Sequence, residues 1–393
     1  MNQRAQLPTL AVAAALALAA AVSLGLARFS YALLLPPMRA DLGWSYFTAG
    51  AMNTLNAAGY LLGALFTPRW LARHDARAVL LCGCAATALL LAGHAAVRSN
   101  ESLFALRFLT GVASAATFVS GGLLAARLVN DGDRRASAGL VLGIYYGGTG
   151  VGIIASALLV PPLTARSAAH AWQSAWLALA LAALLAMAIT AAATRRGRAP
   201  TVAAAQTTRF RWQPFGFGLA GYFMFGLGYI GYMTFIITLL REQQMSTTQS
   251  VGFYIVLGLG VIASSWLWAG LLQRFRGGQS LSLLNGLLAL ATLLPVLSDH
   301  PLAVFASGAL FGAVFLSVVA STTALVRHNL PASAWSAGIS AFTIVFAAGQ
   351  IVGPSLVGWV ADGPGGLARG FVWSAPALAL GSLLAWRQRP LRG

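Results

Sequence analysis

Long apolar stretches alternate with short polar segments along the whole chain. Twelve stretches of at least 17 residues contain no Asp, Glu, Lys or Arg, and each is about long enough to cross the hydrocarbon core of a membrane as a helix. None of them alternates apolar and polar residues as the strands of a membrane barrel do. We expect the first helix to continue past Arg28 to Leu35 and to end at Pro36-Pro37. The twelve stretches cover residues 5–27, 42–68, 78–97, 108–126, 136–165, 167–194, 212–240, 243–273, 277–298, 300–326, 328–361 and 370–386.

The composition excludes a soluble globule. Hydrophobic residues make up 58% of the 393 residues and charged residues only 8%, whereas an ordinary soluble domain has about 25% charged residues. The same numbers exclude intrinsic disorder, because disordered chains are polar. Cys82 and Cys84 lie in one apolar stretch and are interpreted as small packing residues. The sequence therefore predicts an all-α polytopic membrane protein with twelve transmembrane helices.

The distribution of charge predicts the orientation of the chain. All 25 basic residues are arginine, against eight acidic residues, which gives a net charge of +17. With the N-terminus placed inside, the inner segments hold 18 arginines and the outer loops five, so the positive-inside rule predicts two cytoplasmic termini. We interpret these arginines as topology signals and contacts to anionic lipids, not as a nucleic-acid-binding surface. We expect a monomer in the bacterial inner membrane, with membrane lipids and a small-molecule substrate as its partners.

The two halves of the chain repeat one another. The polar segment 195–213 separates six predicted helices in residues 1–194 from six in residues 214–393, and we interpret it as a cytoplasmic linker. Duplicated six-helix halves are the plan of a secondary transporter with its substrate site between the halves. Aligned residues at an offset of 201 are Ser45 and Ser246, Gly59 and Gly260, and Gly111 and Gly312, and at an offset of 199 they include Gly150 and Gly349.

Three motifs in the first half point to a family. They are Gly25-Leu-Ala-Arg28-Phe29-Ser-Tyr31 with the segment that follows to residue 42, Gly59-Tyr-Leu-Leu-Gly63, and Arg107 with Gly111. Together they resemble the major facilitator superfamily, and within it the YbfB/YjiJ-type transporters, over essentially the whole chain. The resemblance implies two pseudo-symmetric six-helix bundles, the major facilitator fold, around a central cavity that opens to one side at a time.

Two motifs of that superfamily are altered here. In the loop after the second helix, Ala72 stands where the motif has Asp, and Asp75 where it has Gly. In the fifth helix Gly148 replaces the proline of the antiporter motif, and the full pattern appears instead in the eleventh helix. These departures weaken an assignment as a drug/proton antiporter. The residues interpreted as helix-packing and gating residues are Gly143, Gly147, Gly353 and Pro354.

Two arginines are the charged residues predicted to lie within the membrane. Every acid and every histidine is placed in a loop or at a helix end, so we expect no obvious proton-carrying side chain inside. Arg28 and Arg107 are expected at similar depth, roughly 9–10 Å from the outer helix ends. A guanidinium offers a fork of donors to a carboxylate, phosphate or sulfonate, so these residues predict an anion clamp. Alternatively, Arg107 bonds helix carbonyls and Arg28 extends outward to the membrane surface.

Polar and aromatic stripes supply the remaining site candidates. Tyr31 follows Arg28 by three residues and is expected to share its helix face. The aromatic stripe of the seventh helix is consistent with a cavity lining and with packing against core or lipid, and the same choice is open for Trp266 and Trp268. The predicted substrate-binding residues are Arg28, Tyr31, Asn53, Asn56, Arg107, Tyr146, Tyr229, Tyr232 and Gln350.

These features favour transport over catalysis. The glycine-rich stretches lack the ending of a phosphate loop, no metal-ligand cluster occurs, and no Ser-His-acid set falls at one depth, so we expect no cofactor, no metal and no enzyme. The favoured function is secondary or facilitated transport of a small organic anion by alternating access. The alternatives are efflux of neutral or cationic amphipathic drugs and a transporter-like sensor or lipid-handling protein.

Overall fold

Twelve helical spans make up the computed structural model, which describes residues 9–128, 138–165, 169–195 and 210–391. No strand occurs in these residues, and the predicted all-α class is confirmed. Eleven of the spans are long and apolar enough to cross a membrane. The other, α3 (Tyr46–Leu71), is less apolar because it carries polar residues such as Asn53 and Asn56, which are buried inside the bundle.

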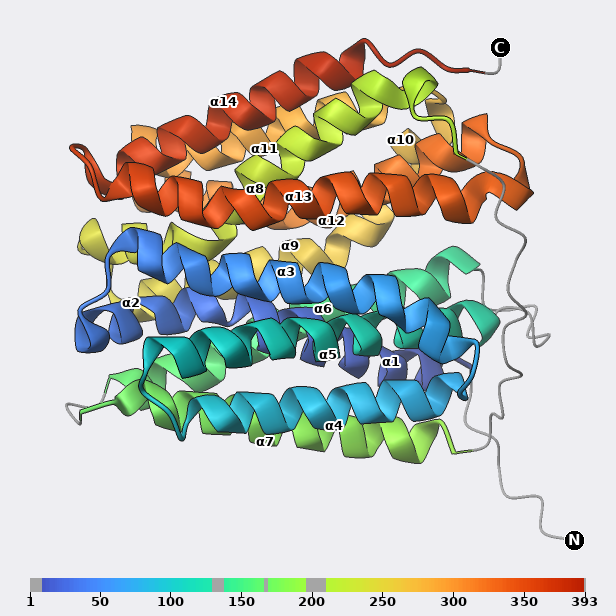
Figure 1. Cartoon of the computed structure of the whole chain (residues 1–393). Helices are drawn as coiled ribbons and strands as arrows, with labels where there is room; N and C mark the ends of the chain where they lie inside the picture. Colours follow the sequence, from blue (N-terminus) through green and yellow to red (C-terminus); the bar gives the residue numbers. More distant parts are fainter. Residues whose placement is uncertain (1–8, 129–137, 166–168, 196–209, 392–393) are drawn as a thin grey trace, which may run out of the picture.

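The spans form two groups that lie on either side of a central plane (Figure 1). The first group has α1 (Thr9–Ala20), the π-helix η1 (Ala21–Phe29), α2 (Tyr31–Leu42), α3, α4 (Ala76–His94), α5 (Asn100–Leu128), α6 (Ala138–Thr164) and α7 (Ala171–Ala193). The second has α8 (Gly216–Glu242), α9 (Thr247–Leu267), α10 (Ala269–Arg274), α11 (Gln279–Leu297), α12 (Pro301–Asn329), α13 (Trp335–Ala361) and α14 (Gly366–Trp386). Most of the linker expected at 195–213 lies outside the described residues.

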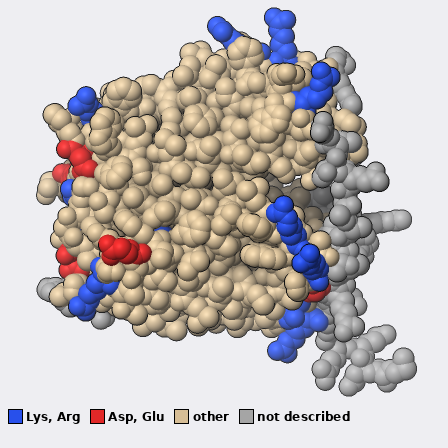
Figure 2. Space-filling model, viewed as in Figure 1, with Lys and Arg blue, Asp and Glu red and all other residues tan. Residues whose placement is uncertain are grey.

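Charges gather at the two ends of the bundle (Figure 2). We call the end at which α1 begins the Arg-rich face and the opposite end, where α2 ends, the acidic face. The apolar band between them is what a membrane requires. The described arginines of the Arg-rich face are Arg69, Arg73, Arg77, Arg127, Arg195, Arg211, Arg274, Arg276, Arg327, Arg387 and Arg389. The described acids of the acidic face are Asp41, Glu101, Glu242, Asp299 and Asp362.

The first span differs from the expected one. It does not end at Pro36-Pro37 but continues through both prolines to Leu42, because neighbouring side chains such as Leu35 and Met38 are fully buried and hold the helix in place. Arg28 is therefore 14 residues from the end of the span, about 21 Å along the axis, not 9–10 Å. The arginine lies near the middle of the span.

Packing within the two groups reproduces the predicted repeat. Gly111 on α5 lies against the backbone of Asn56 on α3, and Gly312 on α12 lies against Leu257 on α9, each 201 residues further on. A side chain at either glycine would overlap the facing carbonyl. The repeat thus preserves the positions at which two helices approach closely.

Candidate functional site

The wide turn of η1 positions the groups of the candidate site. The Ser30 amide donates to the Gly25 carbonyl, five residues earlier, at 2.9 Å. This hydrogen bond spans one residue more than the bonds of an α-helix, as is typical of a π-helix. Two carbonyls of this segment accept hydrogen bonds from other helices. Ala27 accepts from Nη1 of Arg107 at 2.7 Å, and Phe29 accepts from the Tyr254 hydroxyl of the second group at 2.5 Å. The irregular turn therefore joins the first group to the second beside Arg28.

Arg28 lies between the two groups without a counter-charge. It is only 3% exposed, its Nη2 donates to the amide oxygen of Gln350 on α13, and its buried Nε has no hydrogen-bond partner. Among the described residues, no ion pair involves it. Tyr60 on α3 places its ring 5.5 Å from the guanidinium. The contact to Gln350 excludes the alternative in which Arg28 extends outward to the membrane surface.

Arg107 is held by protein groups. The side chain is fully buried, and besides Ala27 its Nη2 reaches Oδ1 of Asn53 at 3.0 Å. Asn56 donates to the Arg107 carbonyl at 3.1 Å. Asn53 in turn donates to Thr234 on α8 at 2.7 Å, which extends the network across to the second group. These contacts fit the alternative in which Arg107 bonds helix carbonyls and polar residues.

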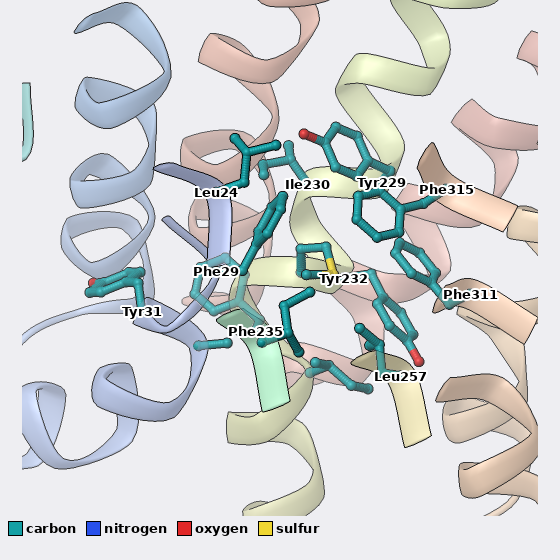
Figure 3. Packing of buried hydrophobic residues seen from close by; sticks show 14 of the residues in the cluster. Leu24, Phe29, Tyr31, Tyr229, Ile230, Tyr232, Phe235, Leu257, Phe311 and Phe315 are labelled. Carbon is teal, nitrogen blue, oxygen red and sulfur yellow. The ribbon is translucent and has the colours of Figure 1, made fainter. Parts of the chain in front are cut away.

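The positions of Tyr31 and Tyr232 differ from the expected ones. Tyr31, which follows the π-helix, contacts Arg107 and α3: its ring lies 5.0 Å from the Arg107 guanidinium and its hydroxyl donates to the Ala49 carbonyl. Tyr232 stacks on Phe311 at 3.9 Å, and its hydroxyl pairs with Ser307. Figure 3 shows the hydroxyls of Tyr229 and Tyr232 pointing in opposite directions. Both Tyr31 and Tyr232 have protein partners in this structure.

Two tyrosines, Tyr60 and Tyr229, lie beside Arg28, and Tyr146 lies near Tyr60. Tyr60 is in electrostatic contact with Arg28, Tyr146 and Tyr229, and none of the three hydroxyls has a hydrogen-bond partner among the described residues. Tyr146 is 39% exposed. The guanidinium and the free hydroxyls of Tyr60 and Tyr229 can therefore offer hydrogen bonds to one ligand group.

Stacked aromatic rings form the wall contributed by the second group. Phe346 on α13 stacks on Tyr222 at 4.8 Å, on Phe225 at 5.2 Å and on Tyr229 at 5.7 Å, with interplanar angles of 16°, 7° and 21°. Such near-parallel rings present an apolar face beside the polar group. The aromatic stripe predicted on the seventh helix is thus mainly packed against α13, with Tyr229 nearest the arginine.

Glycines dominate the contact between α6 and α9, which we call the glycine seam. Gly150 lies directly against the Gly258 carbonyl, Gly147 faces Ile262, and Gly143 faces the ring of Trp266. Gly139, the first glycine of this stripe, faces nothing within 4 Å among the described residues.

A second boundary between the halves is held mainly by hydrogen bonds. It consists of the contact of α3 with α13 and the neighbouring contacts of η1 with α13 and of α3 with α8, and we call it the polar seam. Besides the bonds of Arg28 and Asn53, Thr54 on α3 donates to the Ile351 carbonyl at 2.7 Å. Pro354 lies in the same stretch, and its carbonyl touches Gly50 on α3. Gly353, beside it, packs on Leu227 within the second group.

The two tryptophans at the end of α9 lie in different environments. Trp266 is 44% exposed and lies at the glycine seam against Gly143. Trp268 donates its ring N–H to the Ala313 carbonyl at 2.7 Å and packs within its own half. Trp266 thus belongs to the contact between the halves, and Trp268 does not.

The polar seam is closed at the acidic face. Both oxygens of Asp362 accept from the first amides of α3, at 2.7 Å from Tyr46 and 2.9 Å from Phe47, and the Tyr46 hydroxyl donates to Glu242. The Arg39 guanidinium lies 3.7 Å above the Tyr46 ring. A carboxylate at a helix N-terminus is favoured by the free amides and the helix dipole. This cluster locks the two halves together on that side.

Tyr254 and Asp362 were not among the sequence candidates. For Tyr254 a signal existed, since the offset of 201 pairs it with Asn53, and each reaches the opposite half with a hydrogen bond. For Asp362 the sequence showed only an acid that follows a helix. Its partner is the start of a helix more than 300 residues earlier, at Tyr46.

Comparison with known proteins agrees with this architecture. The family described as "Uncharacterised MFS-type transporter YbfB" matches residues 20–386. Among solved structures, a mutant of the nucleoside transporter NupG aligns with a TM-score of 0.72 and 13% identity over 95% of this chain and 98% of that one. A bacterial homolog of the human lysosomal transporter Spinster, in an inward-facing and unoccupied conformation, aligns with a TM-score of 0.73 and 13% identity over 96% of each chain. The human organic anion transporter MFSD10 (TETRAN) aligns with a TM-score of 0.62 and 16% identity over 97% of this chain and 100% of that one. A search of curated proteins finds no match.

Proposed function

The chain belongs to the YbfB-type family of major facilitator superfamily transporters, and on that premise we propose that its cargo is a small organic anion that binds at Arg28. The family and the fold make it a transporter and not an enzyme. The observation that carries the proposal is a buried guanidinium whose only hydrogen-bond partner among the described residues is a neutral amide. A buried charge without a counter-charge is costly unless a ligand supplies one.

The donors around Arg28 suit an anionic head group. A carboxylate that enters beside the guanidinium can displace the Gln350 amide and accept from the fork as well as from the free hydroxyls of Tyr60 and Tyr229. Pro354 strengthens the case for Gln350 as a movable partner, because proline has no N–H for the carbonyl four residues earlier and loosens the helix at that turn.

The walls suit an apolar body. Phe346 and the rings stacked on it lie next to the polar group through Tyr229, so an amphipathic anion with a planar or aliphatic tail fits better than an inorganic ion. A cationic cargo would need an acid for charge pairing. Within the described membrane-spanning residues, the acids lie at the helix ends of the acidic face, far from Arg28 along the spans.

Rocking of the two halves about this site is the proposed transport movement. The halves are bonded at the acidic face through Asp362 and Glu242, and Figure 2 shows a hollow between them toward the Arg-rich face. In the alternate state the bonds at the acidic face would break and the site would open on that side. We place the Arg-rich face and both termini in the cytoplasm, and the protein as a monomer of two bundles, residues 1–194 and 214–393, in a bacterial inner membrane.

A ligand panel tests the cargo class. The purified full-length protein is heated with benzoate, benzenesulfonate, phenyl phosphate and a cationic drug, and uptake into liposomes is measured for each compound that stabilises it. We expect stabilisation by at least one anion, lost in Arg28→Ala. Stabilisation by the cationic drug alone overturns the anion proposal in favour of drug efflux, and binding without flux in liposomes points to a sensor.

Cysteine accessibility tests the orientation. Single cysteines placed within residues 195–213 and at the C-terminus are expected to react with an impermeant maleimide only after the cells are opened. Labelling of intact cells at any of these positions contradicts the proposed topology.

A further inference from the structure

A buried histidine near Arg107 is a titratable group that lies outside the proposed anion site. His94 ends α4, at a helix end as expected from the sequence, and the residue is fully buried. Its ring stacks on Trp176 of α7 at 4.4 Å with an interplanar angle of 25°. The Arg107 guanidinium lies 5.8 Å from the same tryptophan ring. Helix packing therefore brings an imidazole and an arginine to one tryptophan inside the first half.

The imidazole has one nitrogen free to accept a proton. Its Nδ1 lies 2.7 Å from the Leu90 carbonyl and so acts as the donor in the neutral ring. Nε2 is buried and has no hydrogen-bond partner in the part of the chain that the structure describes, and the same is true of Nε of Arg107 and the ring nitrogen of Trp176. An acceptor that folding leaves unpaired in the interior is costly and calls for a function.

Two opposing fields act on a proton at this nitrogen. His94 is the last residue of α4, and the free carbonyls at a helix C-terminus favour a positive charge there. Burial away from water is the largest effect against such a charge, and Arg107 on α5 opposes it as well. Arg107 in turn donates to the carbonyl of Ala27, the residue before Arg28 in η1, at 2.7 Å, so the two guanidinium groups are neighbours. The other packed helices change this balance little, because α7 has no charged residue in Ala171–Ala193 and Glu101 on α5 is exposed. An anion bound at Arg28 would therefore lie next to the arginine that opposes an imidazolium at His94.

We propose that His94 is the proton-binding residue of this transporter and that it takes up one proton when an organic anion binds at Arg28, so that anion and proton cross the membrane together. The inference rests on the proposed anion site. A bound carboxylate or sulfonate offsets the positive field of the two arginines, which lowers the cost of an imidazolium beside Arg107. Because coupling between two binding equilibria is reciprocal, a proton on His94 must in turn strengthen anion binding at Arg28.

Proton-linked binding tests the inference with benzenesulfonate, which stays ionised throughout and so cannot contribute a proton itself. Affinity is measured in detergent at several pH values between about 6 and 8, where histidine ordinarily titrates. For wild type we expect binding to tighten as the pH falls, by up to about tenfold per pH unit for one linked proton. A pH indicator in weak buffer should report proton uptake that saturates with the ligand.

Matched variants assign the proton to one histidine. His94→Gln and His94→Asn are expected to keep the affinity measured at the alkaline end, to lose its pH dependence and to take up no proton. His300→Gln, at an exposed position on the acidic face, should behave like wild type. In liposomes the His94 variants should still exchange anion for anion but should no longer accumulate it in response to a proton gradient.

The outcomes separate the two proposals. If benzenesulfonate binding depends on Arg28 but wild type shows no pH dependence and no proton uptake, the role of His94 is wrong and the anion site stands. The role of His94 is also wrong if both His94 variants, at wild-type melting temperature, keep the linked proton. If none of the anions of the panel binds in an Arg28-dependent way, the anion site and the His94 inference both fail.

Discussion

The polar seam and the glycine seam occupy equivalent places in the repeat but are built from different chemistry. Along the polar seam, side chains such as Arg28, Asn53 and Thr54 bond directly across to the second half. Along the glycine seam, Gly150 and Gly258 allow the backbones to touch, and no hydrogen bond joins α6 to α9 within the described residues. Hydrogen bonds break and re-form with new partners, whereas backbone contact permits sliding at nearly constant distance. The contrast suggests that one seam switches while the other acts as a pivot.

The asymmetry has a direct origin in the sequence. Asn53 corresponds to Tyr254 and Arg28 to Tyr229 at the offset of 201, so duplication preserved the positions but not the side chains. Charge is confined to the first half of the site, and the aromatic wall belongs mainly to the second. An amphipathic ligand would therefore contact each half with a different part of its structure.

Removal of Arg107 should have the largest effect, because it disconnects the polar seam from the first half. Arg107→Ala deletes hydrogen bonds to Ala27 and Asn53 and leaves a cavity. Two bonds from a charged donor predict a loss of about 3 kcal/mol or more in stability. The melting temperature in detergent and uptake in liposomes should both fall. Wild-type stability in Arg107→Ala contradicts its role as a structural link.

Removal of Arg28 should affect binding more than folding. Loss of a charge-assisted bond predicts about 1.5–3 kcal/mol, or roughly ten- to over a hundredfold weaker anion binding. The melting temperature without ligand should stay near wild type, because among the described residues the arginine bonds only Gln350. Arg28→Lys should recover only part of the affinity, since an ammonium lacks the fork. Calorimetry on all three proteins makes the comparison, and undiminished affinity in Arg28→Ala removes the residue from the site.

A methyl group in the glycine seam tests the pivot. In Gly150→Ala the added carbon would overlap the Gly258 carbonyl, and overpacking of this kind costs about 1–3 kcal/mol. We expect slower transport with anion affinity largely retained. Gly139→Ala is the matched control on the same helix, because no described residue lies within 4 Å of that position. Equal transport rates in the two variants argue against a pivot at Gly150.

Weakening of the acidic-face lock should have the smallest effect. Asp362→Asn keeps one acceptor for the amides of Tyr46 and Phe47 but loses the charge, which predicts about 0.5–2 kcal/mol less favourable closure. Distances between spin labels on α3 and α13 should show a larger open population. Asp299→Asn, another acid of the acidic face, serves as control. An unchanged distance distribution in Asp362→Asn means that the lock does not set the equilibrium.

The candidate site was only partly predictable from the sequence. Arg28, Gln350 and Tyr229 stand out as polar groups on apolar helices, and the structure places them close together. Tyr31 was expected at the same ligand group because regular helical spacing was assumed, whereas its ring and hydroxyl contact Arg107 and Ala49. Tyr232 is taken up by Ser307, a partner that periodicity along one helix does not reveal.

Composition and spacing were enough to establish the class of protein, the twelve spans, the repeat and the distribution of charge at the two faces. Each depends on local composition or on a constant offset, and a membrane stabilises any apolar helix of sufficient length regardless of its neighbours. Folding in three dimensions was needed to show that the first helix continues through two prolines, that His94 is buried, and that Asp362 caps a helix of the other half. These outcomes depend on packing and hydrogen bonds between residues far apart in the chain, and the local pattern around either partner does not contain the energy of such contacts.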